Sequence, residues 1–524
     1  MATPDLPVEI WLEILAYLPR SALHKMLSIN RLLFELALND IYEEIRLVDD
    51  DEEMVKVLKQ LRSPSIAERV KRLYIRPAFL PGMDESNEGS SAEPSGPSSL
   101  EAGFNFLKSL SISRKLRSTI PVPAERIFHL ASTAIKKCIN LRHLTVVVHD
   151  HALTPLFMDF LDSLYHSDSL GPKLTQLSID TTALKLPSLL KPLIKRVSSL
   201  TSLEEFEFSL VDSRFSQTNA DYAASYKTLK TFFETFSKTL ITVSVSTLVP
   251  RDLKPLFTAF PLGKPFRRLQ LCAIFNSATL PTPHELTTFL FNQASGLENL
   301  TLSAHPRQTS FHSSGYEYAD WLLKSSTPTT VEFGSLKFPN LRSLNIELPT
   351  VPHRRNAPLP PLVDIAPNIT TLILTHHYLT FEHLTEIMDN LPTFEPQKIK
   401  LQRFEFRLLS LCPQTFDVLA QKAPRLLELS IEYLRSSADI SGSEVRLWDQ
   451  GKTLNDFREL MQPRRYPNWG LSKLRLACLQ SNSHAHPVPS FMEAVASTLP
   501  KAILMDVDYY CECSFSQHRT PYIM

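Results

Sequence analysis

The chain has 524 residues, with 55 Lys or Arg against 55 Asp or Glu, so its formal net charge is zero. This balance argues against a dedicated nucleic-acid-binding protein, which carries a basic surface. Glycine is scarce, at 12 residues, no GxGxxG or GxxxxGK pattern occurs, and no apolar run reaches the about 18 residues of a membrane helix, so we expect neither nucleotide chemistry nor membrane insertion.

The first element is an apolar helix in the segment DLPVEIWLEILAYLP, residues 5–19. Pro7 suits the first helical position, Glu9 complements the helix dipole in the first turn, and Pro19 ends the helix. The segment lacks a basic n-region and contains Glu9 and Glu13, so it is not an export signal. Six cysteines are too few for a disulfide framework, and we expect a cytoplasmic or nuclear protein with reduced thiols.

Two more helices are expected directly after the first. Ser21 caps a short helix over residues 22–29, and Asn30 caps a third over residues 31–45. The third helix carries a stripe of apolar residues, namely Leu33, Leu36, Ala37 and Ile41. Three helices in about 45 residues bury too little surface to be stable alone, so another surface must cover them.

This block resembles the F-box family, whose motif begins with Leu-Pro-x-Glu-Ile. The matching residues are Leu6, Pro7, Glu9, Ile10, Ile14, Leu15, Leu18, Pro19, Leu23 and Arg31. The sequence departs from the motif at Ala22, where an acidic residue is usual, and at Leu33 and Phe34, where a Trp is usual. The resemblance implies that residues 1–48 bind a Skp-family adaptor and through it a cullin. The implied contact residues are Leu6, Pro7, Ile10, Trp11, Ile14, Leu15, Leu18, Pro19 and Leu23.

Residues 49–103 connect this block to the rest of the chain. We expect residues 49–83 to hold a connecting helix and a first repeat strand in RVKRLYI, near Leu73. Residues 84–103 are rich in Ser, Gly, Pro and Glu and nearly free of large apolar residues. Such a composition predicts a disordered loop, because it buries too little to offset the entropy of ordering.

From residue 104 to 524 a short apolar pattern, L-x-x-L-x-L, recurs at intervals of about 33 residues. Its first positions are Leu141, Leu174, Leu203, Phe266, Leu297, Leu341, Ile369, Leu401, Leu426 and Leu471, with a weaker copy at Leu240. Amphipathic helical segments lie between the copies. Strand and helix in steady alternation predict an α/β fold, a leucine-rich-repeat-like solenoid. A doubly wound α/β domain produces similar alternation and is the alternative.

The repeats are degenerate in their turns. Standard leucine-rich repeats place Asn or Cys eight residues after the first Leu, where the side chain satisfies turn backbone groups. This chain has His149, Thr182, Val211, His305, Pro349, His377 and Leu434 at those positions. We therefore expect the backbone groups of these turns to be satisfied by other residues.

The residues between the apolar positions are expected to line the exposed face of the sheet, a surface that solenoids use for binding. In the later repeats these positions carry charges of both signs, which favour specificity and association rate over raw affinity. The candidate substrate-binding residues are Arg342, Glu347, Arg403, Glu405, Arg407, Glu428, Glu432, Lys473 and Arg475. A solvated, non-binding sheet face is the alternative interpretation.

Candidate chemical sites are weak. Asp506, Asp508, Cys511, Cys513 and His518 are zinc-ligand types, but their spacing is not that of a common zinc site, and a last strand with a tail explains them equally well. The histidines of VVVHDHA and THHYLTFEH are interpreted as surface residues, and QPRRYPNWG as a packed loop. No Ser-His-Asp or Cys-His set has a recognisable spacing, so we expect no catalytic residue, metal or cofactor.

The sequence therefore predicts a non-enzymatic receptor of two parts, which recruits an unidentified protein substrate to a Skp/cullin/F-box ubiquitin ligase. The alternative is a leucine-rich-repeat scaffold whose helical bundle only caps the solenoid. A third hypothesis is an enzyme with its site on the solenoid loops, but the sequence contains no nucleophile–base or metal-binding pattern that supports it.

Overall fold

The computed structural model describes residues 10–11, 13, 31–80, 122–149, 151–166, 170–211, 218–247, 249, 251–261, 266–274, 279–280, 284–304, 333–347, 365–390, 400–436, 450–478, 494–499 and 504–509. The chain divides into two compact units, Met1–Ile241 and Thr242–Met524, and each is described by itself. The expected loop 84–103 lies outside the described residues.

The first unit contains a parallel sheet in which each strand pairs with the next one along the chain. Its strands are β1 (Glu44–Leu47), β2 (Arg72–Ile75), β3 (His143–Val148), β4 (Gln176–Thr181) and β5 (Glu205–Leu210). Its helices are α3 (Arg31–Tyr42), α4 (Glu52–Gln60), α5 (Pro64–Ala67), α7 (Ala124–Ile135), α8 (Pro155–Leu164), α9 (Leu186–Lys195), α10 (Asn219–Phe236) and the 3-10 helix η3 (Gly171–Lys173).

The second unit repeats this arrangement. Its strands are β6 (Thr242–Thr247), β7 (Arg268–Ala273), β8 (Asn299–Ala304), β9 (Ser343–Glu347), β10 (Thr371–Leu379), β11 (Arg403–Leu411), β12 (Glu428–Ser436), β13 (Lys473–Cys478) and β14 (Leu504–Tyr509). The longest of these strands are β10, β11 and β12, of nine residues each. Its helices are α11 (Lys254–Ala259), α12 (His284–Gln293), α15 (Phe381–Asp389), α16 (Pro413–Lys422), α17 (Gln450–Met461) and the 3-10 helix η5 (Phe333–Ser335).

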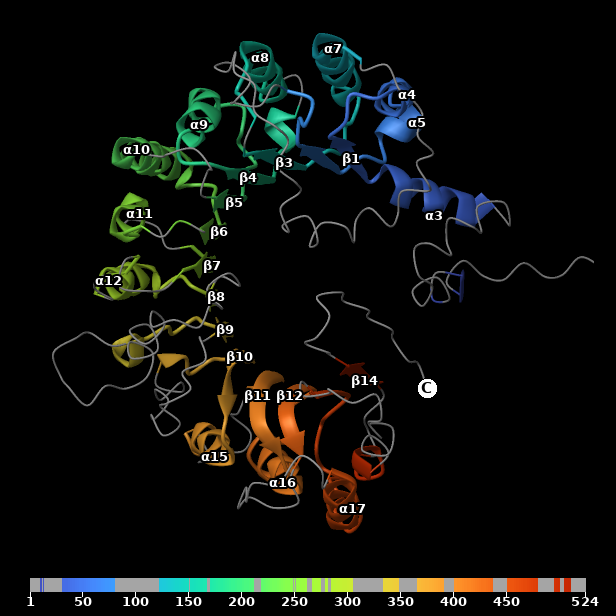
Figure 1. The fold of residues 1–524 in the computed structure, drawn as a ribbon, viewed down its shortest axis with the longest axis vertical. Coiled ribbons are helices and arrows are strands. Elements are labelled where there is room, and N and C mark those ends of the chain that lie inside the picture. Colours follow the sequence, from blue (N-terminus) through green and yellow to red (C-terminus); the bar gives the residue numbers. More distant parts are fainter. Residues whose placement is uncertain are drawn as a thin grey trace, which may run out of the picture. The chain divides into compact units, whose positions relative to one another are not determined.

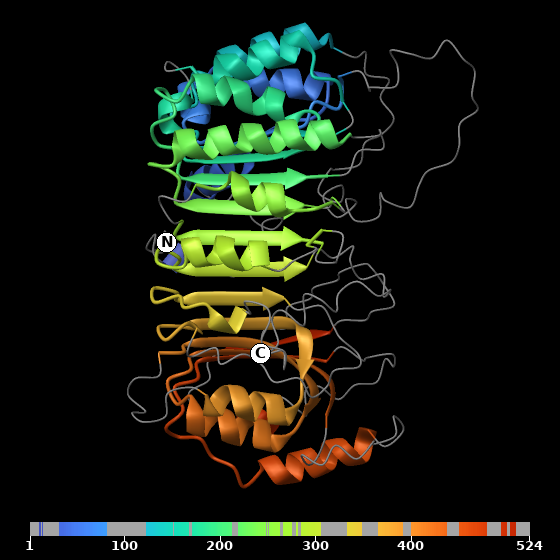
Figure 2. The same ribbon diagram turned by 90° about the vertical axis from the view of Figure 1, so that its left-hand side faces the viewer.

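Strand order within each unit follows chain order, and every pair is parallel. In each unit the helices that connect successive strands lie on one side of the sheet and leave its other side without helices, whereas α3 lies beyond β1 at the end of the first unit (Figures 1 and 2). A doubly wound domain reverses its strand order at a switch point and covers both faces, so this alternative is wrong. The fold is a leucine-rich-repeat-like α/β solenoid.

The apolar positions of the repeat build the core. All eleven first positions are buried: Leu141, Leu174, Leu203, Leu240, Phe266, Leu297, Leu341, Ile369, Leu401, Leu426 and Leu471. In the first unit Phe206 of β5 packs against Phe232 of α10 in a tilted arrangement, with 4.4 Å between ring centres. In the second unit Phe404 and Phe406 of β11 are fully buried, 4.3 Å apart. Each strand thus buries one face against its own helix layer.

In the turn after β4 a threonine stands in for the usual Asn or Cys. At the end of β4, Thr181 Oγ1 donates to the carbonyl of Val148, at 2.9 Å. At the opposite end of the repeats, asparagines directly before a buried first position bridge to the previous repeat. Asn140 donates to Glu68 O at 2.6 Å, Asn340 to Ser295 O at 2.7 Å, and Asn368 to Pro339 O at 2.7 Å.

The third N-terminal helix is shorter than expected. The sequence predicts it over residues 31–45, but α3 ends at Tyr42 and Glu44–Leu47 forms β1. Ile45 and Leu47 are buried while Glu44 and Arg46 alternate with them, and this period of two is that of a strand. The sheet therefore begins one strand before the expected first strand near Leu73, which is β2.

Ion pairs connect neighbouring helices along the solenoid. They join α9 to α8 (Arg196 to Asp162, 2.8 Å), α11 to α12 (Lys254 to Glu285, 3.0 Å) and α16 to α15 (Lys422 to Asp389, 2.7 Å). Among the helices that the structure describes, none has both the length and the apolar character needed to cross a bilayer.

Candidate functional site

The expected adaptor-contact residues fall mostly outside the described part of the chain. Of the nine, only Ile10 and Trp11 are described, and both are helical. Ile10 is exposed and Trp11 is half-buried. The other seven, Leu6, Pro7, Ile14, Leu15, Leu18, Pro19 and Leu23, remain predictions.

Helix α3 is the described part of the F-box-like block, and its sides differ in chemistry. Leu33 and Ala37 are fully buried, and they lie on the far side of the helix from Glu35 and Asn39 at 100° per residue. Phe34 and Ile41 lie next to this buried stripe but are 44% and 42% exposed. The apolar side of α3 is therefore wider than the surface that the described residues cover.

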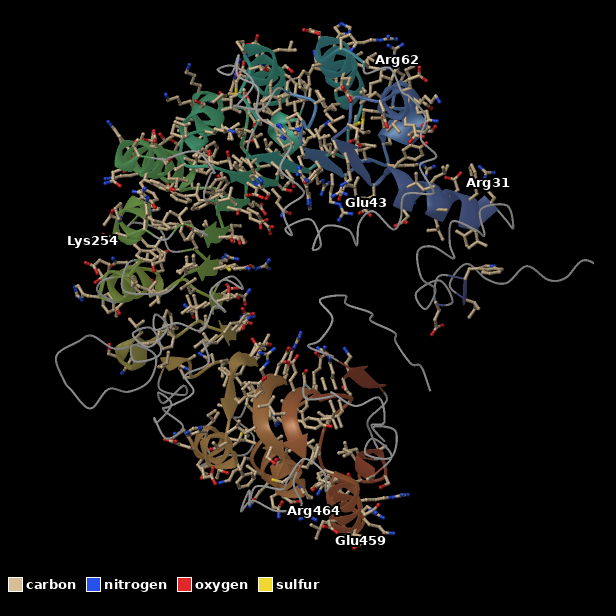
Figure 3. The ribbon with its side chains drawn as sticks, in the orientation of Figure 1. Arg31, Glu43, Arg62, Lys254, Glu459 and Arg464 are labelled. Atoms are coloured by element: carbon tan, nitrogen blue, oxygen red, sulfur yellow. The ribbon has the colours of Figure 1, made fainter. Side chains whose placement is uncertain are left out.

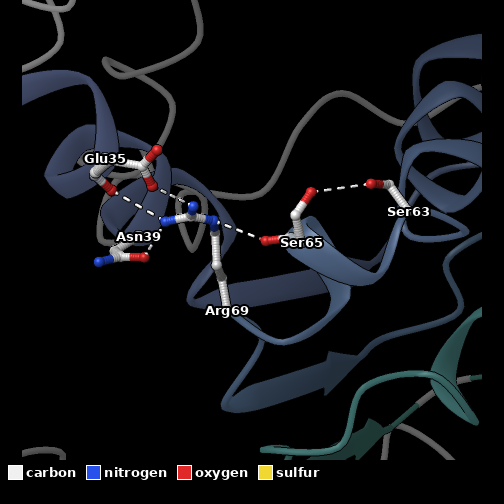
Figure 4. Close-up of polar contacts among 5 residues, drawn as sticks. All are labelled: Glu35, Asn39, Ser63, Ser65 and Arg69. Atoms are coloured by element: carbon white, nitrogen blue, oxygen red, sulfur yellow. Dashed lines mark hydrogen bonds and ion pairs between the residues drawn. The ribbon is translucent and has the colours of Figure 1, made fainter. Parts of the chain in front are cut away.

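The polar side of α3 faces the first repeat, which is the segment from β1 to β2 with α4 and α5 between them. Arg69, in the turn after α5, donates from Nε to Ser65 O at 2.9 Å and from Nη1 to Glu35 O at 3.1 Å (Figure 4). Its Nη1 also reaches Asn39 Oδ1, and its Nη2 forms an ion pair with Glu35 Oε2. All three guanidinium nitrogens are thus used. Nothing in the local sequence pattern marks this contact, because Glu35 and Arg69 are 34 residues apart.

A second polar contact supports the same junction. The Tyr42 hydroxyl donates to Gln60 Oε1 of α4 at 3.0 Å. Tyr42, Glu35 and Asn39 fall on one side of α3, separated by less than about a third of a turn on either side of Glu35. The hydrogen bonds from α3 to α4 and to Arg69 therefore all come from one side of the helix. Phe34 and Ile41 lie on a different side.

On the helix-free face of the second unit, the structure brings four of the nine candidate substrate residues into one partly exposed network, namely Arg403, Glu405, Glu428 and Lys473. Arg403 of β11 lies opposite Glu428 of β12, which lies opposite Lys473 of β13. Arg403 Nη2 is 3.2 Å from Glu405 Oε2, and its Nε is 3.9 Å from Glu428 Oε2. Lys473 Nζ is 2.6 Å from Glu428 Oε1. These charges are already paired with one another.

Arg407 and Glu432 form a separate, more enclosed pair. Arg407 Nε is 2.6 Å from Glu432 Oε2, and its guanidinium lies 6.0 Å from the centre of the Tyr378 ring. Glu432 is only 8% exposed. The expectation that all nine residues line an exposed face is therefore wrong for Glu432, because alternation along a strand predicts the face of the sheet and not the depth at which neighbours cover a side chain.

The remaining three candidates lie around these clusters. Arg475 of β13 is in register with Ser430 of β12, which is in register with Glu405. Glu347 ends β9, and Arg342 immediately precedes that strand. Because β10 lies between β9 and β11, Arg342 and Glu347 are one strand removed from the networks of Arg403 and Arg407.

Two sequence candidates turn out to be structural. His383 is only 6% exposed and completes a capping box with Thr380 at the start of α15, so its interpretation as a surface histidine is wrong. The segment QPRRYPNWG packs as a loop: Arg464 Nε reaches Asp417 Oδ2 of α16 at 3.0 Å, beside α17 (Figure 3). Trp469 is buried and donates to Ala423 O at 3.1 Å.

His149 is partly exposed, and its Nε2 lies 2.9 Å from Asp180 Oδ1 at the ends of β3 and β4. Of the residues weighed as zinc ligands, Asp506 and Asp508 belong to β14, whereas Cys511, Cys513 and His518 lie outside the described residues. Within the described ranges, no three His, Cys, Asp or Glu side chains are grouped to hold a metal ion.

Two of the thiols are unsuited to nucleophilic chemistry. Burial raises the pKa of Cys138 to about 12. Burial also raises the pKa of Cys412 above its ordinary value of 9.0, although hydrogen bonding to Thr415 opposes the rise. At neutral pH both thiols are protonated, and only the thiolate is the nucleophile.

Comparisons with known proteins give fold likenesses only. No family model and no curated protein matches the sequence. A crystal structure of the Rad7 and Elc1 complex in yeast is 15% identical, covers 80% of this chain and 87% of that chain, and has a TM-score of 0.31. A crystal structure of a TLR13–ssRNA13 complex is 15% identical, covers 74% of this chain and 53% of that chain, and has a TM-score of 0.28. Likenesses at these TM-scores define neither partner nor activity.

Proposed function

We propose that this chain is the substrate-recognition subunit of a Skp/cullin/F-box ubiquitin ligase. The N-terminal block binds a Skp-family adaptor, and the solenoid binds the protein to be ubiquitinated. The receptor is not itself an enzyme, because bond formation belongs to the partner subunits. It acts by holding substrate lysines near a charged conjugating enzyme, which raises their effective concentration there.

The observation that carries this proposal is that α3 joins the first repeat through one side and exposes apolar residues on another. The first repeat is joined to this helix through Glu35, Asn39 and Tyr42. A helix that only capped the solenoid needs no further apolar side, yet Phe34 and Ile41 are large, apolar and exposed. Together with the Leu-Pro-x-Glu-Ile motif at Leu6 to Ile10, this exposed side is the kind of surface that a protein partner covers.

The scaffold alternative has one observation in its favour. The contacts of Arg69 and Tyr42 attach α3 to the first repeat, as expected of a helix that closes the end of a solenoid. Capping and adaptor binding are compatible, because they use different sides of α3. The two hypotheses differ only in whether the apolar side has a partner.

The substrate surface proposed here is the helix-free face of β11 to β13. Its exposed charges, Arg403, Glu428 and Lys473, pair with one another in the free protein. A partner with charges of both signs replaces these exposed pairs at little cost, since such pairs are worth about 1 kcal/mol or less. This favours specificity and orientation of the bound protein over affinity.

The adaptor assignment is tested on the full-length chain. The double variant Phe34→Ala with Ile41→Ala should lose co-purification of adaptor and cullin, because truncating a central apolar anchor costs about 2 kcal/mol, or roughly thirtyfold in Kd. Leu6→Ala with Pro7→Ala should have the same effect. The control is Phe291→Ala, which removes a phenylalanine that is 69% exposed on α12, in the helical layer. Undiminished recovery by both double variants would overturn the assignment.

A further inference from the structure

The junction between α3 and the first repeat includes directional contacts. Leu33 and Ala37, the fully buried residues of α3, lie on the side away from Glu35 and Asn39. The Arg69 side chain is only 16% exposed and donates to both ends of one helical turn, at Glu35 and Asn39. Hydrophobic contact is non-directional, whereas these hydrogen bonds have fixed geometry.

The geometry of this contact specifies both the rotation and the axial position of α3. Glu35 and Asn39 are four residues apart and so lie above one another on the helix. One of the acceptors is the main-chain carbonyl of Glu35, whose position does not depend on a side-chain rotamer. The planar guanidinium presents its donors in a rigid fork, so the helix cannot turn or slide without breaking several bonds together.

This constraint also determines the orientation of Phe34 and Ile41. They lie about 100° or more around the helix axis from Glu35, so a fixed rotation of Glu35 fixes the direction in which both apolar side chains point. The opposite end of the fork is anchored by Arg69 Nε to Ser65 O within the first repeat itself. The exposed side of α3 is thereby set at one orientation relative to β1 and β2.

We propose that Arg69 is a positioning residue: it holds α3 in one orientation on the first repeat, so that a protein bound to Phe34 and Ile41 is carried in a fixed direction relative to the solenoid. In its consequence for ubiquitin transfer this inference rests on the proposed function, because the bound protein is then the Skp-family adaptor. The orientation of α3 itself does not depend on that identity.

The first test is hydrogen exchange on the full-length chain. Arg69→Gln should speed exchange of the α3 amides at least tenfold and leave the amides of β3 to β5 at wild-type rates. Arg62→Gln is the matched control, since Arg62 is an exposed arginine seven residues earlier whose side chain takes no part in the junction (Figure 3). Unchanged exchange in α3, or equal acceleration throughout the first unit, would overturn the proposal.

A charge exchange separates positioning from general packing. Arg69→Glu and Glu35→Arg should each accelerate α3 exchange, because each brings like charges together. The double variant should recover part of the protection, since it restores an ion pair across the same junction. A double variant that exchanges as fast as the faster single variant would show that the pair has no specific role.

The second test compares adaptor binding with the rate of ubiquitin transfer, because loss of a merely structural residue would lower both together. With a purified Skp-family adaptor and cullin, Arg69→Gln should bind the adaptor within threefold of wild type but lose at least fivefold in the rate of ubiquitin transfer to proteins held on the solenoid. Loss of adaptor binding in proportion to transfer would overturn the positioning role. If the wild-type chain binds no adaptor, the proposed function fails, and the exchange experiments still decide the orientation of α3.

Discussion

Arg407 and Glu432 face each other across β11 and β12 with 2.6 Å between Nε and Oε2, and the glutamate is almost fully buried. The same face also carries Arg403 and Glu428, whose closest approach is 3.9 Å and whose side chains are 48% and 36% exposed. Two pairs of identical chemistry, four residues apart along the strands, thus have different physical roles. The enclosed pair belongs to the packing of the sheet, and the exposed pair is available to a partner.

Arg407→Ala should destabilise the second unit by about 3 kcal/mol, because it leaves the buried Glu432 carboxylate without its cation. Arg403→Ala should cost less than about 1 kcal/mol, since its pair is exposed. Urea unfolding of the two variants measures the difference. Replacing both members, Arg407→Met with Glu432→Leu, should recover most of the loss. Equal midpoints for Arg407→Ala and Arg403→Ala would contradict the distinction.

The strands were predictable because their signal is local. The repeat needs an apolar residue at each of three positions in every copy, and Leu141, Leu144 and Val146 show the result, since all three are buried. A strand of four residues is harder to predict. In β1 the sequence EIRL directly continues a helical pattern, so the sequence predicts that Glu44 and Ile45 belong to the end of the preceding helix, residues 31–45.

The site was less predictable than the fold. Arg69 and Glu35 meet only because β1, α4 and α5 bring them together, and no spacing rule relates residues 34 positions apart. The depth of Glu432 depends in the same way on neighbouring strands. By contrast, the apolar width of α3 was visible in the sequence, because Leu33, Ala37 and Ile41 follow the helical period.

His383 makes the start of α15 sensitive to pH. The Thr380 N–H donates to His383 Nδ1 at 3.4 Å, which requires an unprotonated nitrogen. Burial lowers the pKa of His383 below its ordinary value of 6.5, although Glu386 and Glu382 oppose the shift. The unfolded chain therefore binds a proton at His383 more readily than the folded chain does. The contribution of His383 to stability is fully present above pH 6.5 and is lost as the pH falls from there toward the lower pKa of His383 in the folded state.

The measurement for His383 is the urea midpoint at pH 8 and at pH 5.5. Wild type contains other histidines, so the informative quantity is its difference from His383→Gln, which cannot titrate. The loss of stability on acidification should be smaller in the variant. An equal or larger loss in His383→Gln would contradict a lowered pKa at this position.

The last prediction concerns the substrate surface. Arg403→Glu with Lys473→Glu reverses the two exposed cations that pair with Glu428, and it leaves the enclosed Arg407–Glu432 pair intact. If a protein substrate binds this face, the variant should fail to capture it from cells in which the proteasome and cullins are inhibited. Stability should fall by no more than about 1 to 2 kcal/mol, because both cations are exposed.

The control for this reversal is Lys254→Glu, which breaks an exposed ion pair with Glu285 on the helical side of the second unit. Both variants should retain wild-type recovery of adaptor and cullin, since Arg403, Lys473 and Lys254 all lie outside the N-terminal block. If Arg403→Glu with Lys473→Glu still recovers the wild-type set of ubiquitinated proteins, the helix-free face of β11 to β13 is not the substrate surface. Loss of those proteins by Lys254→Glu instead would place the binding surface on the helical layer, because that is the side on which Lys254 and Glu285 lie.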